Sequence, residues 1–277
     1  MEKENGHYYF DANINGKVPA RLMLESGIFV MVMDSIYAFE NKEAINLDYE
    51  RTQGSQKMNL GGKVYDITHK AKGTVQLGNN AEYNGEIFIL SDYNTYSEIA
   101  IPIQNIRNTK DGCRVIQLDM EKHELMSLDR EQLNAAAQGY NAIDINYDSY
   151  LGMPSVQTRL DFIKDGQSYS IPGNYLLDLG NGSFVFMMKH NQVVQEFLVS
   201  HPEIELRKAY NNQGELVAEA ITTEEASLCN RNFEKPIIAI TAALPNFTVE
   251  GSIGLKFFEG AVHIFDFDNR KFYTKNL

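Results

Sequence analysis

Residues 175–186 of the chain read YLLDLGNGSFVF and place one carboxylate, that of Asp178, between two apolar runs joined by glycines. An ionisable group inside an apolar segment is costly to bury unless it is paired or functional. Residues 22–31, LMLESGIFVM, show the same pattern around Glu25. Each stretch predicts a buried strand that ends at an acid, followed by a turn with a glycine two residues on. Two acids in matching contexts indicate a pair.

The segments that precede the two acids also match. Residues 7–14 alternate between apolar and polar, as in a half-buried strand, and Asn15-Gly16 is typical of a tight hairpin. The returning strand, residues 18–24, leads to the first acid. In the second half, a strand over residues 156–163 followed by Asp165-Gly166 predicts the same hairpin before the second acid.

The spacing of these landmarks indicates an internal duplication. The two acids are 153 positions apart, and two later aspartates, Asp119 and Asp266, are 147 positions apart. Each later aspartate is followed six residues on by an apolar residue, and we interpret both as hairpin residues. Landmarks in the same order at nearly one offset predict two homologous β-rich lobes, residues 1–139 and 140–277.

Local signals place the remaining elements. Turn residues predict several strands between residues 45 and 90, and capping residues predict short helices. The turns are expected at Gly61-Gly62, Gly78-Asn79 and Asn84-Gly85; the helices are expected from Asp34 through Phe39, from a capping box at residues 129–132 through Gln138, and from His190 to Ser200 before Pro202.

Composition excludes several classes of protein. The net charge of -12 argues against nucleic acid and anionic membranes as partners, because both repel an acidic chain. Two cysteines, Cys113 and Cys229, are too few for a disulfide framework, and their spacing leaves open whether they pair. No apolar run approaches the roughly 18 residues of a transmembrane helix. The first residues lack the apolar core of a leader, so we expect a cytoplasmic protein, or a secreted or periplasmic one whose leader has been removed.

Paired lobes give the two acids a definite chemistry. A pseudo-twofold axis would bring equivalent turns together, and two close carboxylates share one proton and titrate as a pair. Such a pair can activate a water toward a carbonyl carbon and protonate the carbonyl oxygen, without metal or covalent intermediate. Ser26 supplies a hydroxyl next to Glu25, whereas Leu179 supplies none next to Asp178. Gly27 and Gly180 allow the backbone to approach the carboxylates.

At these residues the chain resembles the aspartic peptidases of the pepsin-like and retropepsin-like group, with their Asp-Thr/Ser-Gly turns. Residues 177–180, LDLG, look like that motif. Residues 251–258, GSIGLKFF, are similar to the apolar-apolar-Gly segment that packs beneath the catalytic turn, and the chain through Asp266 resembles the final hairpin. The first half departs: Glu25 replaces Asp, and residues 108–113 lack the apolar-apolar-Gly segment.

The resemblance implies a mostly β, two-lobed pepsin/retropepsin-like acid-protease fold with a central cleft, a few short helices and a β-barrel arrangement of strands. It implies an endopeptidase in which Asp178 and Glu25 are catalytic, while Ser26, Gly27 and Gly180 shape the turns beside an extended peptide or unfolded protein substrate. A hairpin over residues 58–68, with Gly61-Gly62 at its tip, is expected to cover the substrate and to offer Tyr65 to it. Both lobes lie in one chain, which favours a monomer.

Simpler interpretations stay open. Asp178 alone is compatible with an ordinary turn beside glycines, Glu25 with an exposed strand end, and the Tyr65 hairpin with a plain surface hairpin. Since glutamate is one methylene longer than aspartate, its carboxylate would overshoot a pair built for two aspartates. The alternatives are therefore a catalytically inactive relative that binds a peptide or other ligand in the cleft, or a purely structural protein.

No cofactor or metal is expected. The chain has no H-E-x-x-H motif, no P-loop, no dinucleotide-binding glycines and no G-x-S-x-G. Residues 144–155 begin like a calcium-binding loop, but serine stands in place of the turn glycine and of the final glutamate.

Overall fold

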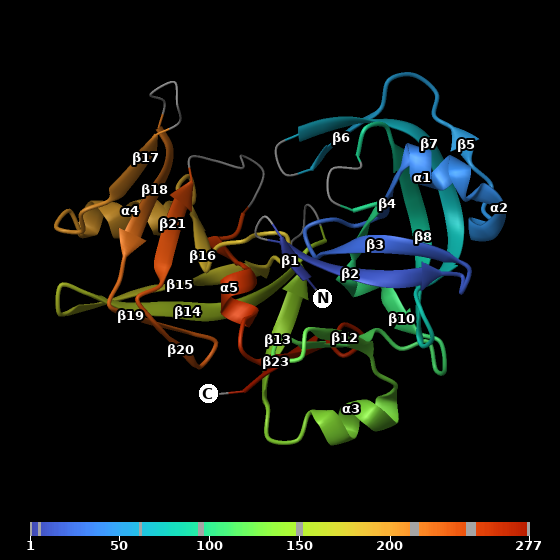
Figure 1. Ribbon diagram of the computed structural model, residues 1–277. Helices are drawn as coiled ribbons and strands as arrows, with labels where there is room; N and C mark the ends of the chain where they lie inside the picture. Colours follow the sequence, from blue (N-terminus) through green and yellow to red (C-terminus); the bar gives the residue numbers. More distant parts are fainter. Residues whose placement is uncertain are drawn as a thin grey trace. The chain divides into compact units, whose positions relative to one another are not determined.

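The computed structural model describes residues 2–4, 7–60, 63–93, 97–147, 152–210, 216–241 and 248–275. The chain folds into two compact units: residues 1–118 with 123–136, and residues 119–122 with 137–277. Both units are mostly β, as the sequence predicts (Figure 1). The predicted division between residues 139 and 140 lies three residues after the end of the first unit's last segment.

The first unit is built on a sheet whose strands run in the order β1-β2-β3-β9-β4-β8-β7-β5, with β10 beside β8 and β6 beside β7. Short helices follow β4, and a last helix follows β12. Its elements are β1 (Glu2–Glu4), β2 (His7–Ile14), β3 (Val18–Glu25), β4 (Met31–Asp34), α1 (Ser35–Glu40), α2 (Lys42–Ile45), β5 (Glu50–Arg51), β6 (Lys57–Leu60), β7 (Lys63–Gln76), β8 (Ala81–Leu90), β9 (Ile99–Pro102), the 3-10 turn η1 (Ile103–Asn105), β10 (Ile106–Asn108), β11 (Val115–Asp119), β12 (Glu124–Ser127) and α3 (Arg130–Ala136).

Local sequence signals explain several of these elements. Asn15 and Gly16 adopt φ values of 51° and 66°, and they join β2 to β3 in the predicted hairpin. The Asp34 carboxylate accepts hydrogen bonds from the N–H groups of Ile36 and Tyr37 at 2.9 and 3.1 Å, so it caps α1 as predicted. Before α3, the predicted capping box is confirmed by the reciprocal bonds between Asp129 and Gln132.

One predicted turn is wrong. Asn84-Gly85 lies inside the long strand β8, which pairs with β7 across both residues. A side chain at position 85 would meet the Tyr83 hydroxyl at 2.7 Å, so this glycine makes room for a buried tyrosine in a strand. The predicted turn at Gly61-Gly62 lies outside the described residues, but β6 and β7 on either side of it pair as a hairpin.

The second unit has its strands in the order β23-β24-β13-β14-β15-β22-β16-β21-β18-β17, with β19 beside β14 and β20 beside β19. Its elements are β13 (Asn141–Tyr147), β14 (Pro154–Lys164), β15 (Gln167–Leu177), β16 (Val185–Met188), α4 (Gln192–Ser200), β17 (Arg207–Tyr210), β18 (Leu216–Thr222), β19 (Glu225–Leu228), β20 (Arg231–Glu234), β21 (Ile237–Thr241), β22 (Gly251–Ile253), α5 (Leu255–Phe258), β23 (Val262–Asp266) and β24 (Lys271–Thr274).

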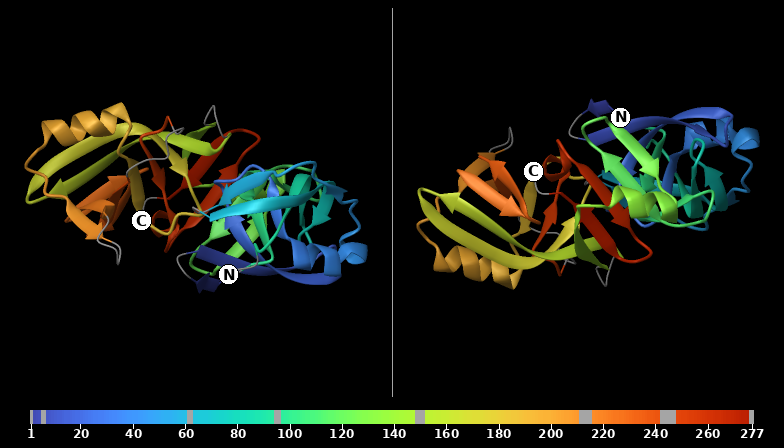
Figure 2. Two further views of the ribbon diagram at one scale, coloured as in Figure 1. Left: turned by 90° about the horizontal axis from the view of Figure 1, so that it is seen from above. Right: turned by 90° about the horizontal axis from the view of Figure 1, so that it is seen from below.

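A long hairpin and an aromatic core organise this unit. Asp165 and Gly166 take φ values of 50° and 73° at the predicted turn between β14 and β15. Helix α4 packs along this hairpin (Figure 2). The ring of Phe197 lies 6.0 Å from that of Phe162. The helix begins at Gln192, two residues after its predicted start at His190, because the side chain of Asn191 accepts the N–H of Val193 and caps it.

The two units share one order of strand pairing. In the first unit, β3 runs parallel to β9, β9 antiparallel to β4, and β4 parallel to β8. In the second, β15 runs parallel to β22, β22 antiparallel to β16, and β16 parallel to β21. The two units therefore repeat one arrangement of four strands. The internal duplication of the amino-acid sequence stays a prediction.

Asp119 and Asp266 are hairpin residues, as interpreted from the sequence. The Asp119 carboxylate accepts hydrogen bonds from the N–H groups of Glu121 and Lys122 after β11. The Asp266 carboxylate accepts bonds from the backbone and side chain of Asn269 after β23. Both carboxylates close turns between strands, and neither belongs to the candidate site.

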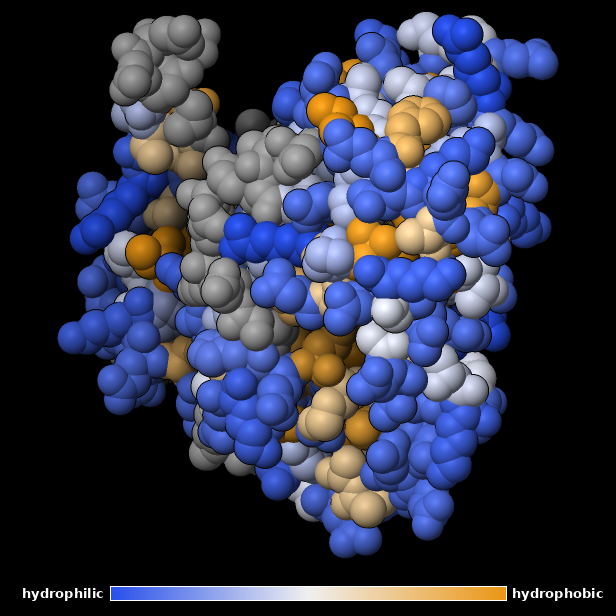
Figure 3. Space-filling view, turned by 45° about the vertical axis from the view of Figure 1, so that its right-hand side comes forward, coloured by the Kyte–Doolittle hydropathy of each residue, from blue (hydrophilic) through white to orange (hydrophobic). Residues whose placement is uncertain are grey.

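The expectation of a β-barrel is wrong, because the described strands form no closed barrel. The pairing path of the first unit has free ends at β1 and β5, and that of the second ends at β17, so the sheets are open. Cys113 and Cys229 are buried and are not joined by a disulfide. The face in Figure 3 is mostly hydrophilic, in keeping with the acidic composition, with scattered hydrophobic side chains. Over the part of the chain that the structure describes, no helix combines the length and hydropathy that crossing a bilayer requires.

Candidate functional site

Asp178 stands directly after the last residue of β15. Its backbone N–H donates to the carbonyl of Ile253 in β22 at 2.9 Å, which extends the parallel pairing of Leu177 with Ile253 by one bond. The carboxylate is half-buried and accepts two hydrogen bonds. The N–H of Gly180 donates to Oδ1 at 3.1 Å, and the Ser252 hydroxyl donates to Oδ2 at 3.1 Å. The turn thus presents a carboxylate that is held at both oxygens.

The turn after Asp178 is fixed by close backbone packing against β22 and α5. Gly254 donates to the carbonyl of Phe184 at 2.9 Å, and Leu255 donates to the carbonyl of Asn181 at 2.7 Å. A Cβ atom at position 254 would lie 2.3 Å from the Ser183 carbonyl oxygen. Only glycine permits this approach, which explains the glycine that ends the predicted segment beneath the turn.

Electrostatics at Asp178 combine two opposed effects. Burial disfavours the charged form and raises the pKa of the Asp178 carboxyl, while the bonds from Ser252 and Gly180 act in the lowering direction. Burial is the larger effect, so the carboxyl keeps its proton to a higher pH than an ordinary aspartate. A carboxyl of this kind can serve as a general acid.

Glu25 is the last residue of β3 and occupies the corresponding position in the first unit. Leu24 pairs with Ile101 of β9, and Glu25 follows with Pro102 as partner. The residue is half-buried beside Tyr93. Burial, and to a smaller degree the charge of Glu25, raises the pKa of the Tyr93 hydroxyl. Glu25 is thus a strand-end acid next to a buried tyrosine rather than an isolated surface charge.

The position predicted for the segment beneath the Glu25 turn, the counterpart of residues 251–258, is wrong. The pattern of the second half predicts this segment at residues 108–113, but the strand that pairs in parallel with β3 is β9, Ile99–Pro102. Pro102 stands where Gly254 stands in the second unit. The turn is held differently as well: the side chains of Gln104 and Asn105 donate to the carbonyls of residues 28 and 29 at 2.6 and 3.0 Å. Side chains here replace the backbone bonds of the second unit.

The other predicted site residues are distributed between the units. Ser26 is buried beside Glu25, followed by the half-buried Gly27. Gly180 belongs to the Asp178 turn through its N–H, and Leu179 is buried there. Tyr65 lies in β7, pairs with Met58 across the predicted hairpin, and is 8% exposed.

Tyr65 is part of the core of the first unit. Its ring lies 5.7 Å from that of Tyr93 in an edge-on arrangement, and both belong to a hydrophobic cluster with Ile28 and Val32. The tyrosine therefore connects the hairpin to the neighbourhood of Glu25. Contact with a ligand stays a prediction for this residue.

Sequence reasoning missed Ser252 and Asn181. The Asn181 side-chain amide donates to the Ser252 oxygen at 3.1 Å, and Ser252 in turn donates to Asp178. A signal was present in the sequence, because residues 252–254, Ser-Ile-Gly, carry a polar residue where the apolar-apolar-Gly pattern has its first apolar residue. Its meaning could not be seen before the parallel pairing of β15 with β22 was known.

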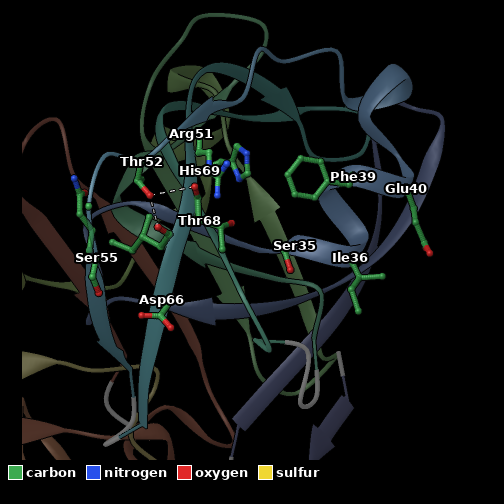
Figure 4. A pocket seen from close by; sticks show the side chains of 13 residues that line it. Ser35, Ile36, Phe39, Glu40, Arg51, Thr52, Ser55, Asp66, Thr68 and His69 are labelled. Atoms are coloured by element: carbon green, nitrogen blue, oxygen red, sulfur yellow. Dashed lines mark hydrogen bonds between the residues drawn. The ribbon is translucent and has the colours of Figure 1, made fainter.

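A separate pocket of about 1050 Å³ lies on the first unit, between α1 and the strands β5 and β7. Phe39 points from α1 toward His69 and Arg51 (Figure 4), and its ring lies 4.9 Å from that of His69. Burial is the main cause that lowers the pKa of His69. The residues that line this pocket do not include Glu25. Among the described residues, no group of three or more His, Cys, Asp or Glu side chains is placed to hold a metal ion.

Comparison with solved structures identifies the fold. The crystal structure of the aspartic proteinase from Irpex lacteus matches with a TM-score of 0.59 and 9% sequence identity, over 97% of this chain and 94% of that one. No family model and no curated protein matches the sequence. At this identity the likeness concerns the fold and not the activity. The chain has the mostly β fold of pepsin-like aspartic proteinases, which confirms the fold predicted from its acid turns.

Proposed function

We propose that the protein is an aspartic-type endopeptidase that uses Asp178 and Glu25 to hydrolyse peptide bonds. The observation that carries the proposal is the Asp178 carboxyl on the turn after β15, which is fixed by hydrogen bonds at both oxygens and whose pKa is raised by burial. The equivalent position of Glu25 at the end of β3, in a fold also found in an aspartic proteinase, supports a paired role.

The chemistry follows from one shared proton. The ionised carboxylate takes a proton from water as the water oxygen attacks the carbonyl carbon, and the protonated carboxyl gives its proton to the carbonyl oxygen. The tetrahedral intermediate then collapses: the C–N bond breaks, the amine leaves with a proton, and a carboxylic acid remains. Substrate is an extended peptide or an unfolded protein chain, because hydrolysis of this type needs access to the backbone.

A second candidate is a catalytically inactive relative that binds a peptide or another ligand. Two observations favour it. Glu25 carries one methylene more than aspartate, and a misplacement of about 1 Å can cost about a hundredfold in rate. Leu179, which stands where a hydroxyl would brace the turn, is buried in the second unit.

The test is cleavage of an unfolded protein substrate from pH 3 to 7 by the wild type, Asp178→Asn and Glu25→Gln. Asp165→Asn is the matched control, because Asp165 is an exposed hairpin residue in the same unit. We expect activity in the wild type and the control and its loss in both site variants. Activity that survives both substitutions overturns the proposal, and a pure, folded wild type without cleavage at any pH favours the inactive relative.

A further inference from the structure

The Asp178 carboxylate lies at the end of a directed chain of hydrogen bonds within the second unit. The backbone N–H and the hydroxyl of Ser183 both donate to Asn181 Oδ1, at 2.9 and 2.7 Å. Asn181 Nδ2 donates to Ser252 Oγ at 3.1 Å, and Ser252 Oγ donates to Asp178 Oδ2 at 3.1 Å. Four residues are thus linked in one sequence of donors and acceptors.

The chemistry of the groups fixes the direction of this chain. Two donors face one end of the Asn181 amide, so that end is the carbonyl oxygen, and the NH₂ faces Ser252. A hydroxyl has one hydrogen and two lone pairs. Because Asn181 occupies a lone pair of Ser252, the single hydrogen of the hydroxyl is free to point at Asp178.

Burial makes the hydroxyl hard to replace. Ser252 is 2% exposed and lies in β22 between β15 and β16. Without its hydroxyl, Asp178 Oδ2 would lose a donor and Asn181 Nδ2 would lose an acceptor, and an unpaired buried polar group is costly. The Asp178 carboxylate would then be held only at Oδ1, by Gly180, and could rotate.

The first unit carries no hydroxyl at the position equivalent to Ser252. Val32 of β4 pairs with Ala100 of β9, as Phe186 of β16 pairs with Ser252 of β22. Ala100 therefore takes the place of Ser252 beneath Glu25 and carries only a methyl group. The two acids differ in their support as well as in their length.

We propose that Ser252, itself oriented by Asn181, is the positioning residue that fixes the Asp178 carboxylate and separates its role from that of Glu25. The part of the inference that concerns catalysis rests on the proposed peptidase function. The fixation of the carboxylate does not, since every bond in the chain lies within the second unit. Asp178 accepts hydrogen bonds from Ser252 and Gly180, and the proposed function adds Glu25 as its partner acid.

The test compares Ser252→Ala with Ser252→Thr, which keeps the hydroxyl, and with Ser155→Ala, which removes a different buried serine hydroxyl of the same unit. The pKa of the Asp178 carboxyl is read from its carbon-13 NMR shift, assigned with Asp178→Asn, and cleavage kinetics are measured in parallel. Asn181→Ala serves as a second variant that leaves Ser252 in place but unoriented.

We expect Ser252→Ala to raise the pKa of Asp178 and to lower kcat by about tenfold to a hundredfold with little change in KM, because a bond to a charged group is lost. Ser252→Thr should restore both values, and Ser155→Ala should leave both unchanged. If Ser252→Ala changes neither the pKa of Asp178 nor kcat, the inference is overturned. Cleavage by the wild type would still support the proposed peptidase function in that case. A raised pKa in a protein that never cleaves supports the positioning role and removes the proposed function.

Discussion

Glu25 and Asp178 occupy the same position in the same arrangement of strands, each directly after a leucine that pairs with an isoleucine of a parallel strand. The pairs are Leu24 with Ile101 and Leu177 with Ile253. The two backbone positions are equivalent, but the Glu25 side chain is one methylene longer. Its carboxylate therefore lies farther from its own backbone than the Asp178 carboxylate does. The difference of one methylene is therefore a property that mutation can probe.

Shortening the first acid should improve catalysis. We expect Glu25→Asp to raise kcat by about tenfold to a hundredfold, since it removes an overshoot of about one methylene on a backbone that matches the Asp178 position. Cleavage kinetics with the unfolded substrate check this, with Glu25→Gln as the control that keeps the length and removes the charge. A fall in kcat would show that the turn is set back to suit glutamate.

Removing the buried charge at Asp178 should stabilise the protein at neutral pH. Because burial raises the pKa of this carboxyl above its ordinary value of 3.8, the native state holds a proton that the unfolded state releases, and stability falls as pH rises past that value. Asp178→Asn should therefore melt at a higher temperature than the wild type at pH 7, and the advantage should vanish at pH 3. An equal difference at pH 7 and at pH 3 would contradict a raised pKa at Asp178.

A buried histidine should make the second unit sensitive to acid. Burial, with the charge of Arg231 adding to it, lowers the pKa of His263 to about 3. The unfolded value is about 6.5, so the stabilisation is complete above that pH and is lost progressively as pH falls toward 3. The loss amounts to at most about 5 kcal/mol.

Thermal melts of the wild type and His263→Phe between pH 7 and 4 check this dependence. The substitution keeps a ring against Phe272, which stacks on His263 at 5.6 Å, and removes the titration. We expect a flatter dependence on pH in the variant. Phe272→Leu disturbs the same packing but leaves His263 in place, so it should lower the melting temperature by the same amount at every pH. A difference from the wild type that changes with pH in Phe272→Leu would assign the pH dependence to packing. Cleavage assays at pH 3 need this control for folding.

Gly254 should tolerate no side chain. In Gly254→Ala the new Cβ would lie 2.3 and 2.5 Å from the carbonyl oxygens of Ser183 and Asn181, which are backbone atoms of the Asp178 turn. We expect a loss of about 1–3 kcal/mol in the free energy of unfolding and a marked loss of cleavage. Gly16→Ala, where space is open but φ is +66°, should cost stability and leave cleavage unchanged. Full activity in Gly254→Ala would show that the turn can move.

Local signals predicted what depends on neighbours in the sequence. Positive φ at Asn15-Gly16 and Asp165-Gly166, the cap at Asp34 and the box at Asp129 each arise from residues a few positions apart, and all four were confirmed. Asn84-Gly85 failed for a reason outside that range, because the two residues pair with Thr74 and Gly73 of β7 within a long antiparallel ladder.

The sequence by itself determined that each half delivers one acid from an apolar strand into a glycine turn, because alternation, turn residues and the cost of burying a charge are readable in a linear chain. Only the tertiary structure decided what lies beneath each turn. Strands β9 and β22 come from residues about 75 positions after the acids they support, and a short apolar run does not state its partner. Parallel pairing across that distance brings Ser252 to Asp178 and Ala100 beneath Glu25, and so makes two similar turns chemically unequal.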